Sequence, residues 1–195
     1  MKSMQNSNFG ADSMKVKLEM LNESDFPQII RWVNQYPENF MIQWAGQTYK
    51  YPLTLEQMKE HYRHGINSIE SDVFIYRIMN DKKFIGTIQL CRFNFEQKEA
   101  VVGRFLIGDE VNRGKGIGRA ALDEIVRIGF NDFKLIKIRL NVFDINMQAI
   151  NCYKSIGFRE NQYLEKVYQD RTGEWWNNIE MKLMKEQWLG IRRRH

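Results

Sequence analysis

The chain has 195 residues, 43% of them apolar and 27% charged, which is the composition of an ordinary soluble domain. This length suits one domain with a substantial core. No apolar run approaches the roughly 20 residues of a membrane-spanning helix, and residues 1–13 lack the apolar segment of a secretion signal. Cys91 and Cys152 have neither disulfide nor metal-ligand spacing. We therefore expect a cytoplasmic protein with no membrane partner.

The formal net charge is +5, and Arg192, Arg193 and Arg194 supply three of these charges. The rest of the chain has no zinc-finger spacing and no basic helix with interleaved aromatic residues. Charge alone is weak support for nucleic-acid binding, so we expect no nucleic-acid partner. We expect a monomer or a homodimer.

The first elements are predicted from periodicity and capping residues. Residues 1–13 show no periodicity, which predicts a disordered leader. Residues 16–21 alternate between apolar and polar and predict a strand. Ser24 is the expected N-cap of a helix that Pro37 ends. The apolar face of this helix consists of Phe26, Ile29, Ile30 and Val33.

An aromatic connection follows at residues 36–51. Thr54 and Gln57 then form a capping-box pattern, which predicts a helix to about Gly65. His61 and His64 on this helix are three residues apart, a spacing that metal sites also use, but no third ligand is visible nearby. We interpret both histidines as solvent-facing helix residues.

The middle and end of the chain predict further strands. Short polar turns imply antiparallel pairing of three strands at residues 73–79, 84–93 and 100–107. A strand at residues 137–143 precedes a helix that begins at Asn146 and ends at Gly157. A hairpin then pairs residues 158–168 with residues 175–184. Together these elements predict one mixed α/β domain.

Residues 105–119 pass from an apolar strand through a glycine-rich loop into an amphipathic helix. Gly114, Gly116 and Gly118 alternate with larger residues, and arginines flank them. Glycine lets the backbone approach a ligand closely, and the unpaired N–H groups of a helix's first turn attract anions. We therefore predict a phosphate-binding loop. The helix after it has an apolar stripe of Ile117, Ala121, Leu122, Ile125, Val126 and Ile128.

Two common phosphate-binding patterns fit this loop poorly. A Walker loop requires Gly-x-x-x-x-Gly-Lys followed by Ser or Thr, which the chain lacks. The dinucleotide fingerprint matches from Gly116 to Ala121, with Asp144 at the end of the next strand. That fold normally continues with several parallel strands, whereas this chain ends in an antiparallel hairpin. The dinucleotide interpretation is therefore disfavoured.

The loop is similar to the pyrophosphate-binding motif of the Gcn5-related N-acetyltransferase (GNAT) superfamily, Arg/Gln-x-x-Gly-x-Gly/Ala. Arg113, Gly116 and Gly118 occupy its fixed positions. Residues 146–158 resemble the family's other cofactor-side motif. Across residues 16–188 the layout resembles the ribosomal-protein N-terminal acetyltransferase branch, which also includes enzymes for small amines and amino sugars.

The resemblance implies a single GNAT-like domain at residues 14–188, followed by a basic tail at residues 189–195. Its sheet would be mixed and mostly antiparallel, with about seven strands and helices on both faces. Two parallel central strands, residues 100–107 and 137–143, would splay apart and admit acetyl-CoA as co-substrate, without a metal. The implied activity is acetyl-CoA-dependent transfer of an acetyl group to a primary amine of a small molecule or of a protein N-terminus.

The same resemblance assigns roles to individual residues. Tyr153 is the expected catalytic acid, because a phenol stays protonated at neutral pH and can protonate a departing thiolate. The pantetheine arm would pair with the backbone near Leu106 and Ile107, and Asn146 would bond that arm. The expected cofactor-binding residues are Leu106, Ile107, Arg113, Gly114, Lys115, Gly116, Ile117, Gly118, Arg119, Asn146 and Tyr153.

The sequence leaves open which residues form the acceptor pocket and which residue acts as the general base. Phe40, Trp44 and Tyr49, with Tyr51, either line the acceptor pocket or pack the N-terminal helices. Related enzymes often carry a glutamate where this chain has Val101, and we expect the nearby Glu99 on the opposite strand face. The base is therefore unassigned, and a second function stays open: a non-catalytic acyl-CoA-binding sensor or regulatory module.

Overall fold

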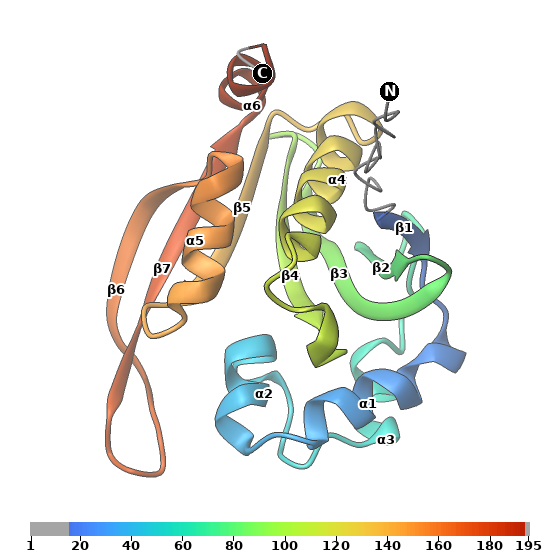
Figure 1. The fold of residues 1–195 in the computed structure, drawn as a ribbon, viewed down its shortest axis with the longest axis vertical. Helices are drawn as coiled ribbons and strands as arrows, with labels where there is room; N and C mark the ends of the chain where they lie inside the picture. Colours follow the sequence, from blue (N-terminus) through green and yellow to red (C-terminus); the bar gives the residue numbers. More distant parts are fainter. Residues whose placement is uncertain (1–15, 194–195) are drawn as a thin grey trace, which may run out of the picture.

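The computed structural model describes residues 16–193, which form one seven-stranded sheet in the order β1-β2-β3-β4-β5-β7-β6 (Figure 1). All neighbouring strands pair antiparallel except β4 and β5, which are parallel. The predicted strands are confirmed, each to within one residue at either end. The leader expected at residues 1–13 lies outside the described residues. The strands are β1 (Val16–Met20), β2 (Val73–Asn80), β3 (Lys83–Asn94), β4 (Glu99–Ile107), β5 (Lys137–Phe143), β6 (Arg159–Gln169) and β7 (Trp175–Met184).

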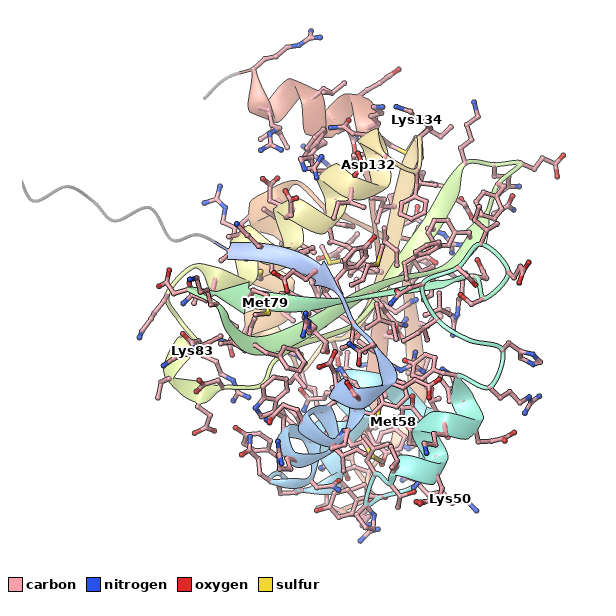
Figure 2. All side chains as sticks on the ribbon, turned by 90° about the vertical axis from the view of Figure 1, so that its right-hand side faces the viewer. Lys50, Met58, Met79, Lys83, Asp132 and Lys134 are labelled. Atoms are coloured by element: carbon pink, nitrogen blue, oxygen red, sulfur yellow. The ribbon has the colours of Figure 1, made fainter. Side chains whose placement is uncertain are left out.

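Helices cover both faces of the sheet, as predicted. α4 and α5 lie side by side on one face, and the first three helices gather at one end of the molecule (Figure 1). Met58 of α3 is 1% exposed and packs in the core of that end, whereas Lys50 points outward (Figure 2). The helices are α1 (Phe26–Asn34), α2 (Glu38–Ala45), α3 (Leu55–His61), α4 (Ile117–Asn131), α5 (Met147–Ile156) and α6 (Lys185–Arg192).

The two parallel strands pair only along their first halves. Their register runs from Glu99 opposite Lys137 to Val102 opposite Leu140. At this closed end the Glu99 carboxylate forms ion pairs with Lys137 and, at 2.9 Å, with Arg139. Beyond Val102, the edge of β4 that faces β5 has no strand partner among the described residues. Buried backbone groups need partners, so this parted region is suited to a ligand that supplies them.

A β-bulge in β4 redirects the strand where it parts from β5. Gly103 pairs with Gln89 of β3 but Leu106 pairs with Thr87, so β4 carries one extra residue between these pairs. Val102 and Leu106 would share a face in a regular strand. Instead Val102 packs in the core under α4 and α5, and Leu106 packs in the core of the first three helices. The bulge therefore reverses which face of the sheet the side chains in the second half of β4 occupy.

The N-terminal half contains a helix that the sequence did not predict. Residues 38–45 of the aromatic connection form α2, with Met41 and Ile42 buried. The apolar positions of this segment are largely consecutive and do not mark one helical face. The helix after β1 begins differently from the prediction. Asn22 rather than Ser24 is the capping residue: its side chain accepts the Ser24 N–H and caps a 3-10 turn, Glu23–Asp25, that leads into α1. α3 ends at His61, earlier than the expected Gly65.

The C-terminal helix α6 was also not predicted. It follows β7 directly, and its Trp188 is 4% exposed against the core. Arg192 forms an ion pair with Asp123 of α4 at 2.9 Å and lies over the Trp188 ring. Helical structure thus continues to Arg192, past the expected start of the basic tail. Residues 194–195 lie outside the described residues.

Candidate active site

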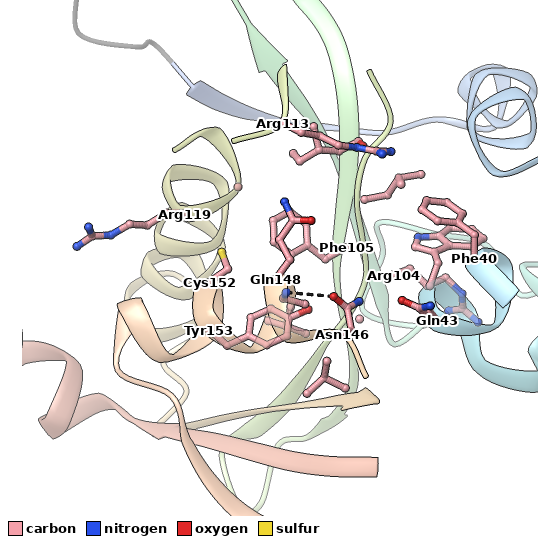
Figure 3. Close-up of a pocket in the computed structure, with 18 of the residues that line it drawn as sticks. Phe40, Gln43, Arg104, Phe105, Arg113, Arg119, Asn146, Gln148, Cys152 and Tyr153 are labelled. Carbon is pink, nitrogen blue, oxygen red and sulfur yellow. Dashed lines mark hydrogen bonds between the residues drawn. The ribbon is translucent and has the colours of Figure 1, made fainter. Parts of the chain in front are cut away.

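A cleft of about 530 Å³ occupies the space between the parted strands. Its walls are the second half of β4, the end of β5, the glycine-rich loop, and parts of α2, α4 and α5 (Figure 3). The cleft is thus bounded by segments that are far apart in the sequence. Of the predicted residues, those that line it are Phe40, Trp44, Leu106, Ile107, Arg113, Gly114, Gly116, Gly118, Arg119, Asn146 and Tyr153.

The glycine-rich loop presents the start of α4 to this cleft. Gly114 and Gly116 have φ values of +73° and +79°, in the left-handed region that favours glycine. Gly116 is the N-cap residue of α4, and its carbonyl accepts the first intrahelical hydrogen bond, from Ala120 at 3.0 Å. The N–H groups of Ile117, Gly118 and Arg119 therefore have no intrahelical acceptor. They make the cleft edge an anion-binding position.

The basic residues near the loop do not all face the cleft. Arg113 donates from Nε to the Ile107 carbonyl at 3.0 Å, and its guanidinium lies over Tyr36 and Phe40. Arg119 borders the cleft, but its side chain extends away from the centre (Figure 3). Lys115 is exposed and lies outside the cleft lining. These arginines therefore play different parts: Arg113 braces the loop and Arg119 lies at its rim.

Ile117 and Tyr49 were predicted site residues, and their side chains lie outside the cleft lining. The Ile117 side chain is 1% exposed and packs in the core under α4, so only its backbone N–H is near the cleft. Tyr49 is 6% exposed and stacks on Trp44 with ring centroids 6.1 Å apart. Both alternatives for the aromatic connection therefore apply, each to different residues. Phe40 and Trp44 line the cleft, whereas Tyr49 packs behind them.

Helix α5 contributes two of the expected functional side chains. Asn146 is its N-cap, and its Oδ1 accepts the Ala149 N–H at 3.1 Å, which leaves the amide nitrogen without a hydrogen-bond partner in residues 16–193 (Figure 3). Tyr153 lines the cleft at 8% exposure, and its hydroxyl also lacks a partner in the described chain. Burial, with a smaller contribution from Cys152, raises the pKa of Tyr153 above its usual value. Its hydroxyl is therefore protonated at neutral pH.

The sequence did not indicate several cleft residues, and the predicted strand face of Glu99, near the cleft, was wrong. Glu99 and Val101 lie two residues apart on the same face of β4, contrary to the expectation, because side chains alternate along a strand. Lys137 and Arg139 already bind the Glu99 carboxylate. The polar cleft residues that the sequence did not indicate are Gln43, Arg104, Asn112, Asn141, Gln148 and Cys152. Gln148 and Cys152 lie within residues 146–158, and the resemblance of this segment to the family's cofactor-side motif was the only signal for them.

A sheet that opens between two parallel strands, with a glycine-rich helix start at the opening, defines a protein that binds an extended, phosphate-bearing ligand. The family model described as acetyltransferase (GNAT) domain matches residues 15–159, and the chain belongs to this family. The protein is therefore an acetyl-CoA-dependent N-acetyltransferase, and the GNAT resemblance read from the loop is confirmed.

Other proteins are similar to most of this chain in sequence or in fold. The aminoglycoside N(6')-acetyltransferase type 1 of Klebsiella pneumoniae is 28% identical over 152 residues, which cover 73% of each chain. The structure of spermidine N-acetyltransferase from Vibrio cholerae in complex with CoA and spermine has a TM-score of 0.75 at 20% identity, covering 89% of this chain and 98% of the other. A dodecameric structure of the same Vibrio cholerae enzyme has a TM-score of 0.71 at 21% identity, covering 90% and 97%.

Within residues 16–193, no helix is long and apolar enough to cross a membrane. The same residues hold no group of three or more His, Cys, Asp or Glu side chains arranged around a possible metal ion. His64 is exposed, as predicted. His61 is exposed as a whole, but its ring packs edge-on against Tyr49 and Tyr62 and so loses part of its hydration.

Proposed function

We propose that this protein acetylates the primary amine of a small molecule, and that the uncharged amine attacks acetyl-CoA directly. The observation that carries the proposal is the parting of β4 from β5 beyond Val102, which opens a cleft between the loop and Tyr153 on one side and α2 on the other. A cleft of about 530 Å³ is in the size range of small-ligand sites. A ribosomal-protein N-terminus stays a second acceptor class to be tested.

The residues present fit the phosphate-bearing part of coenzyme A. Gly114, Gly116 and Gly118 line the cleft without side chains, and the first-turn N–H groups of α4 are available as donors. A Cβ on Gly118 would meet its nearest neighbour at 3.5 Å, so the loop is not forced by packing to have glycine there. Close approach of a ligand is the remaining reason for it.

The backbone of β4 fits the pantetheine part. The Leu106 carbonyl lies against Gly86 of β3, since a Cβ on Gly86 would be 2.2 Å from it, and the Ile107 carbonyl already accepts from Arg113. Because backbone groups alternate between the two neighbours of a strand, Phe105 and Ile107 would present their N–H groups toward the cleft. We assign the pairing with the ligand's amides to these N–H groups, and we assign the Asn146 amide nitrogen as an additional donor.

Acetyl-CoA supplies a thioester whose carbonyl carbon accepts the amine. On this chain, backbone N–H groups of β4 past the bulge would stabilise charge that develops on the carbonyl oxygen. Removing one such donor typically costs about 3–4 kcal/mol of barrier. The Tyr153 hydroxyl holds a proton for the leaving sulfur, and its raised pKa keeps that proton in place. Tyr153 is thus the proposed general acid.

No described side chain of the cleft is a carboxylate or a histidine. A base acting directly from the cleft wall is therefore absent from the proposal. The amine enters uncharged, and the proton that its nitrogen loses after the attack leaves through water. The same feature favours the alternative, a non-catalytic acyl-CoA-binding module. Tyr153, held with an unpartnered hydroxyl in the cleft, argues against that alternative.

Release of CoA separates these functions. The purified chain is incubated with acetyl-CoA and a panel of small amines and peptides, and free thiol is measured. The proposal expects CoA release with small amines, and mass spectrometry should find the acetylated amine. Binding of acetyl-CoA by calorimetry, without CoA release for any acceptor, would leave only the sensor. Release with peptides alone would assign the acceptor to protein N-termini. Sedimentation of the same sample tests the expected monomer or homodimer.

A further inference from the structure

The charged side chains that line the cleft in the described chain are all arginines: Arg104, Arg113 and Arg119. The acidic residues of the neighbouring elements are already engaged. Glu38 of α2 forms an ion pair with Arg171. Asp144 accepts hydrogen bonds from Asn177 at 2.7 Å and from Tyr163 at 2.9 Å. The cleft therefore offers positive charge and no free carboxylate to an incoming acceptor.

Arg104 borders the cleft on the side of α2, where Phe40 and Trp44 form the proposed acceptor wall. It lies within the bulge of β4 with a φ of +41°, on the side of Phe40 and Gln43 (Figure 3). Its guanidinium lies over the rings of Tyr49 and Tyr62, 5.4 and 5.8 Å from their centroids. The bulge and these rings fix its position beside the cleft. A fixed, planar guanidinium is well suited to bind carboxylate or phosphate.

Most hydrogen-bonding capacity of Arg104 is unused. A guanidinium has five N–H donors, and the contact found among the described residues is a 3.3 Å bond from Nη2 to the Thr48 hydroxyl. The Nε atom is buried without a partner, and no acidic side chain within residues 16–193 forms an ion pair with Arg104. Among the other cleft arginines, Arg113 has Glu110 within 3.6 Å.

The groups around Arg104 do not offset its charge. Loss of hydration, together with the charges of Arg104 and Arg92, lowers the pKa of His61 to about 4, so this ring is neutral at pH 7. Tyr49, Tyr62 and Thr48 are neutral as well, and burial raises the pKa of the nearby Cys91 thiol, so that it too is neutral. A polycationic acceptor would meet repulsion at this end of the cleft, whereas an anionic group would meet an unpaired cation.

We propose that Arg104 binds an anionic group of the acceptor, so that the acceptor is a primary amine that also carries a carboxylate or a phosphate. This inference rests on the proposed acetyltransferase function and narrows its substrate class. Arg104 acts on specificity: it holds the far end of the acceptor while the amine reaches the thioester. A polyamine is excluded as the preferred acceptor.

The test uses matched pairs of amines that differ in the acidic group. Free amino acids are paired with their decarboxylated amines, ethanolamine is paired with O-phosphoethanolamine, and spermidine represents polyamines. The rate of CoA release at several amine concentrations gives kcat/KM, which is calculated from the concentration of the uncharged form of each amine. We expect at least one acidic member to exceed its partner roughly 10- to 100-fold. The arm that responds, carboxylate or phosphate, identifies the anionic group. Preference for spermidine, or for every amine without the acid, overturns the inference.

Variants then assign the preference to Arg104. Arg104→Gln is expected to lower kcat/KM for the acidic acceptor roughly 10-fold or more, mainly through KM, and to leave its uncharged partner within about twofold. Arg104→Lys should restore part of the preference. Arg92→Gln is the matched control, since it removes a nearby positive charge outside the cleft lining and should leave the preference unchanged. An equal loss for both members of a pair in Arg104→Gln overturns the inference.

The outcomes also separate this inference from the proposed function. Acetyl-CoA binding without CoA release in any arm overturns the proposed function, and the inference with it. CoA release that ignores the acidic group overturns only the inference. Because the wild-type panel alone decides between these outcomes, the test does not depend on the folding of the variants.

Discussion

Arg113 donates from its Nε atom to the main-chain carbonyl of Ile107, 3.0 Å away, and so ties the glycine-rich loop to the end of β4. Its guanidinium also lies over Tyr36 at 5.2 Å and over Phe40 at 5.8 Å. One side chain thus joins the loop to β4, to α2 and to the turn that precedes α2. The arginine of the family motif acts here as a brace for the loop.

The first prediction concerns this brace. Arg113→Lys keeps the charge but loses the planar Nε donor and its stacking, so the loop should become less ordered. We expect the Kd for acetyl-CoA to rise roughly 5- to 10-fold, as for loss of one hydrogen bond. Calorimetry measures this Kd. Arg63→Lys, at an exposed arginine just after α3 and outside the cleft, is the control and should leave the Kd unchanged. An unaltered Kd in Arg113→Lys would contradict the bracing role.

The second prediction concerns charge at Gly116, the N-cap of α4 with a φ of +79°. Asn and Asp have nearly the same size, and both tolerate left-handed backbone better than other side chains. Gly116→Asn and Gly116→Asp therefore differ mainly in charge. If diphosphate binds at this helix start, Gly116→Asp should bind acetyl-CoA about tenfold or more weakly than Gly116→Asn. Equal affinities by calorimetry would place the diphosphate elsewhere.

Much of this fold follows from the sequence, because strand alternation and helical stripes report directly which face is buried. Lys137–Phe143 and Met147–Ile156 show clear patterns, and both elements form as predicted. α2 was missed because its apolar residues are consecutive. The position of Arg104 could not be predicted from the sequence either. A bulge is a mismatch between two paired strands, so the sequence of one strand does not reveal it. The site therefore depends on tertiary features that local patterns do not encode.

The third prediction concerns Tyr153. Tyr153→Phe removes the hydroxyl and keeps the buried ring, so kcat should fall about 10²- to 10⁴-fold, the usual contribution of a general acid. The Kd for acetyl-CoA should change less than about twofold, since the lost group acts on the leaving sulfur. Tyr76→Phe is a matched control, at a buried core tyrosine outside the cleft, and its kcat should stay near that of the wild type. An unchanged kcat in Tyr153→Phe would remove this residue from the mechanism.

The pH dependence of kcat/KM gives an independent check on this role. Burial raises the pKa of Tyr153 above its ordinary value of about 10, so the hydroxyl stays protonated through neutral and mildly alkaline pH. The rate should therefore rise with pH as the acceptor amine loses its proton, with no fall due to Tyr153 below about pH 10. A decline near pH 8 or 9 that disappears in Tyr153→Phe would contradict the raised pKa of this hydroxyl, although not its role as the acid.

The last prediction concerns the closed end of the parted strands. The Glu99 side chain is 7% exposed and forms ion pairs with Lys137 and Arg139 across β4 and β5. The hydrogen bond from Lys137, with the charge of Arg139, lowers the pKa of Glu99. Glu99→Gln should reduce the free energy of unfolding at pH 7 by about 1.5–3 kcal/mol, as for hydrogen bonds to a charged group. Urea denaturation measures this difference.

The pH dependence of this loss has a definite sign. The folded pKa of Glu99 lies below its unfolded value of about 4.3, so its stabilisation is complete above that pH and is lost as the pH falls through the folded pKa. The gap between wild type and Glu99→Gln should therefore be constant from pH 6 to 8 and shrink below about pH 4. Glu160→Gln, which breaks an exposed pair with Lys154, should cost at most about 1 kcal/mol. Equal costs for the two variants would show that the closed end of β4 and β5 is held by backbone pairing rather than by the Glu99 carboxylate.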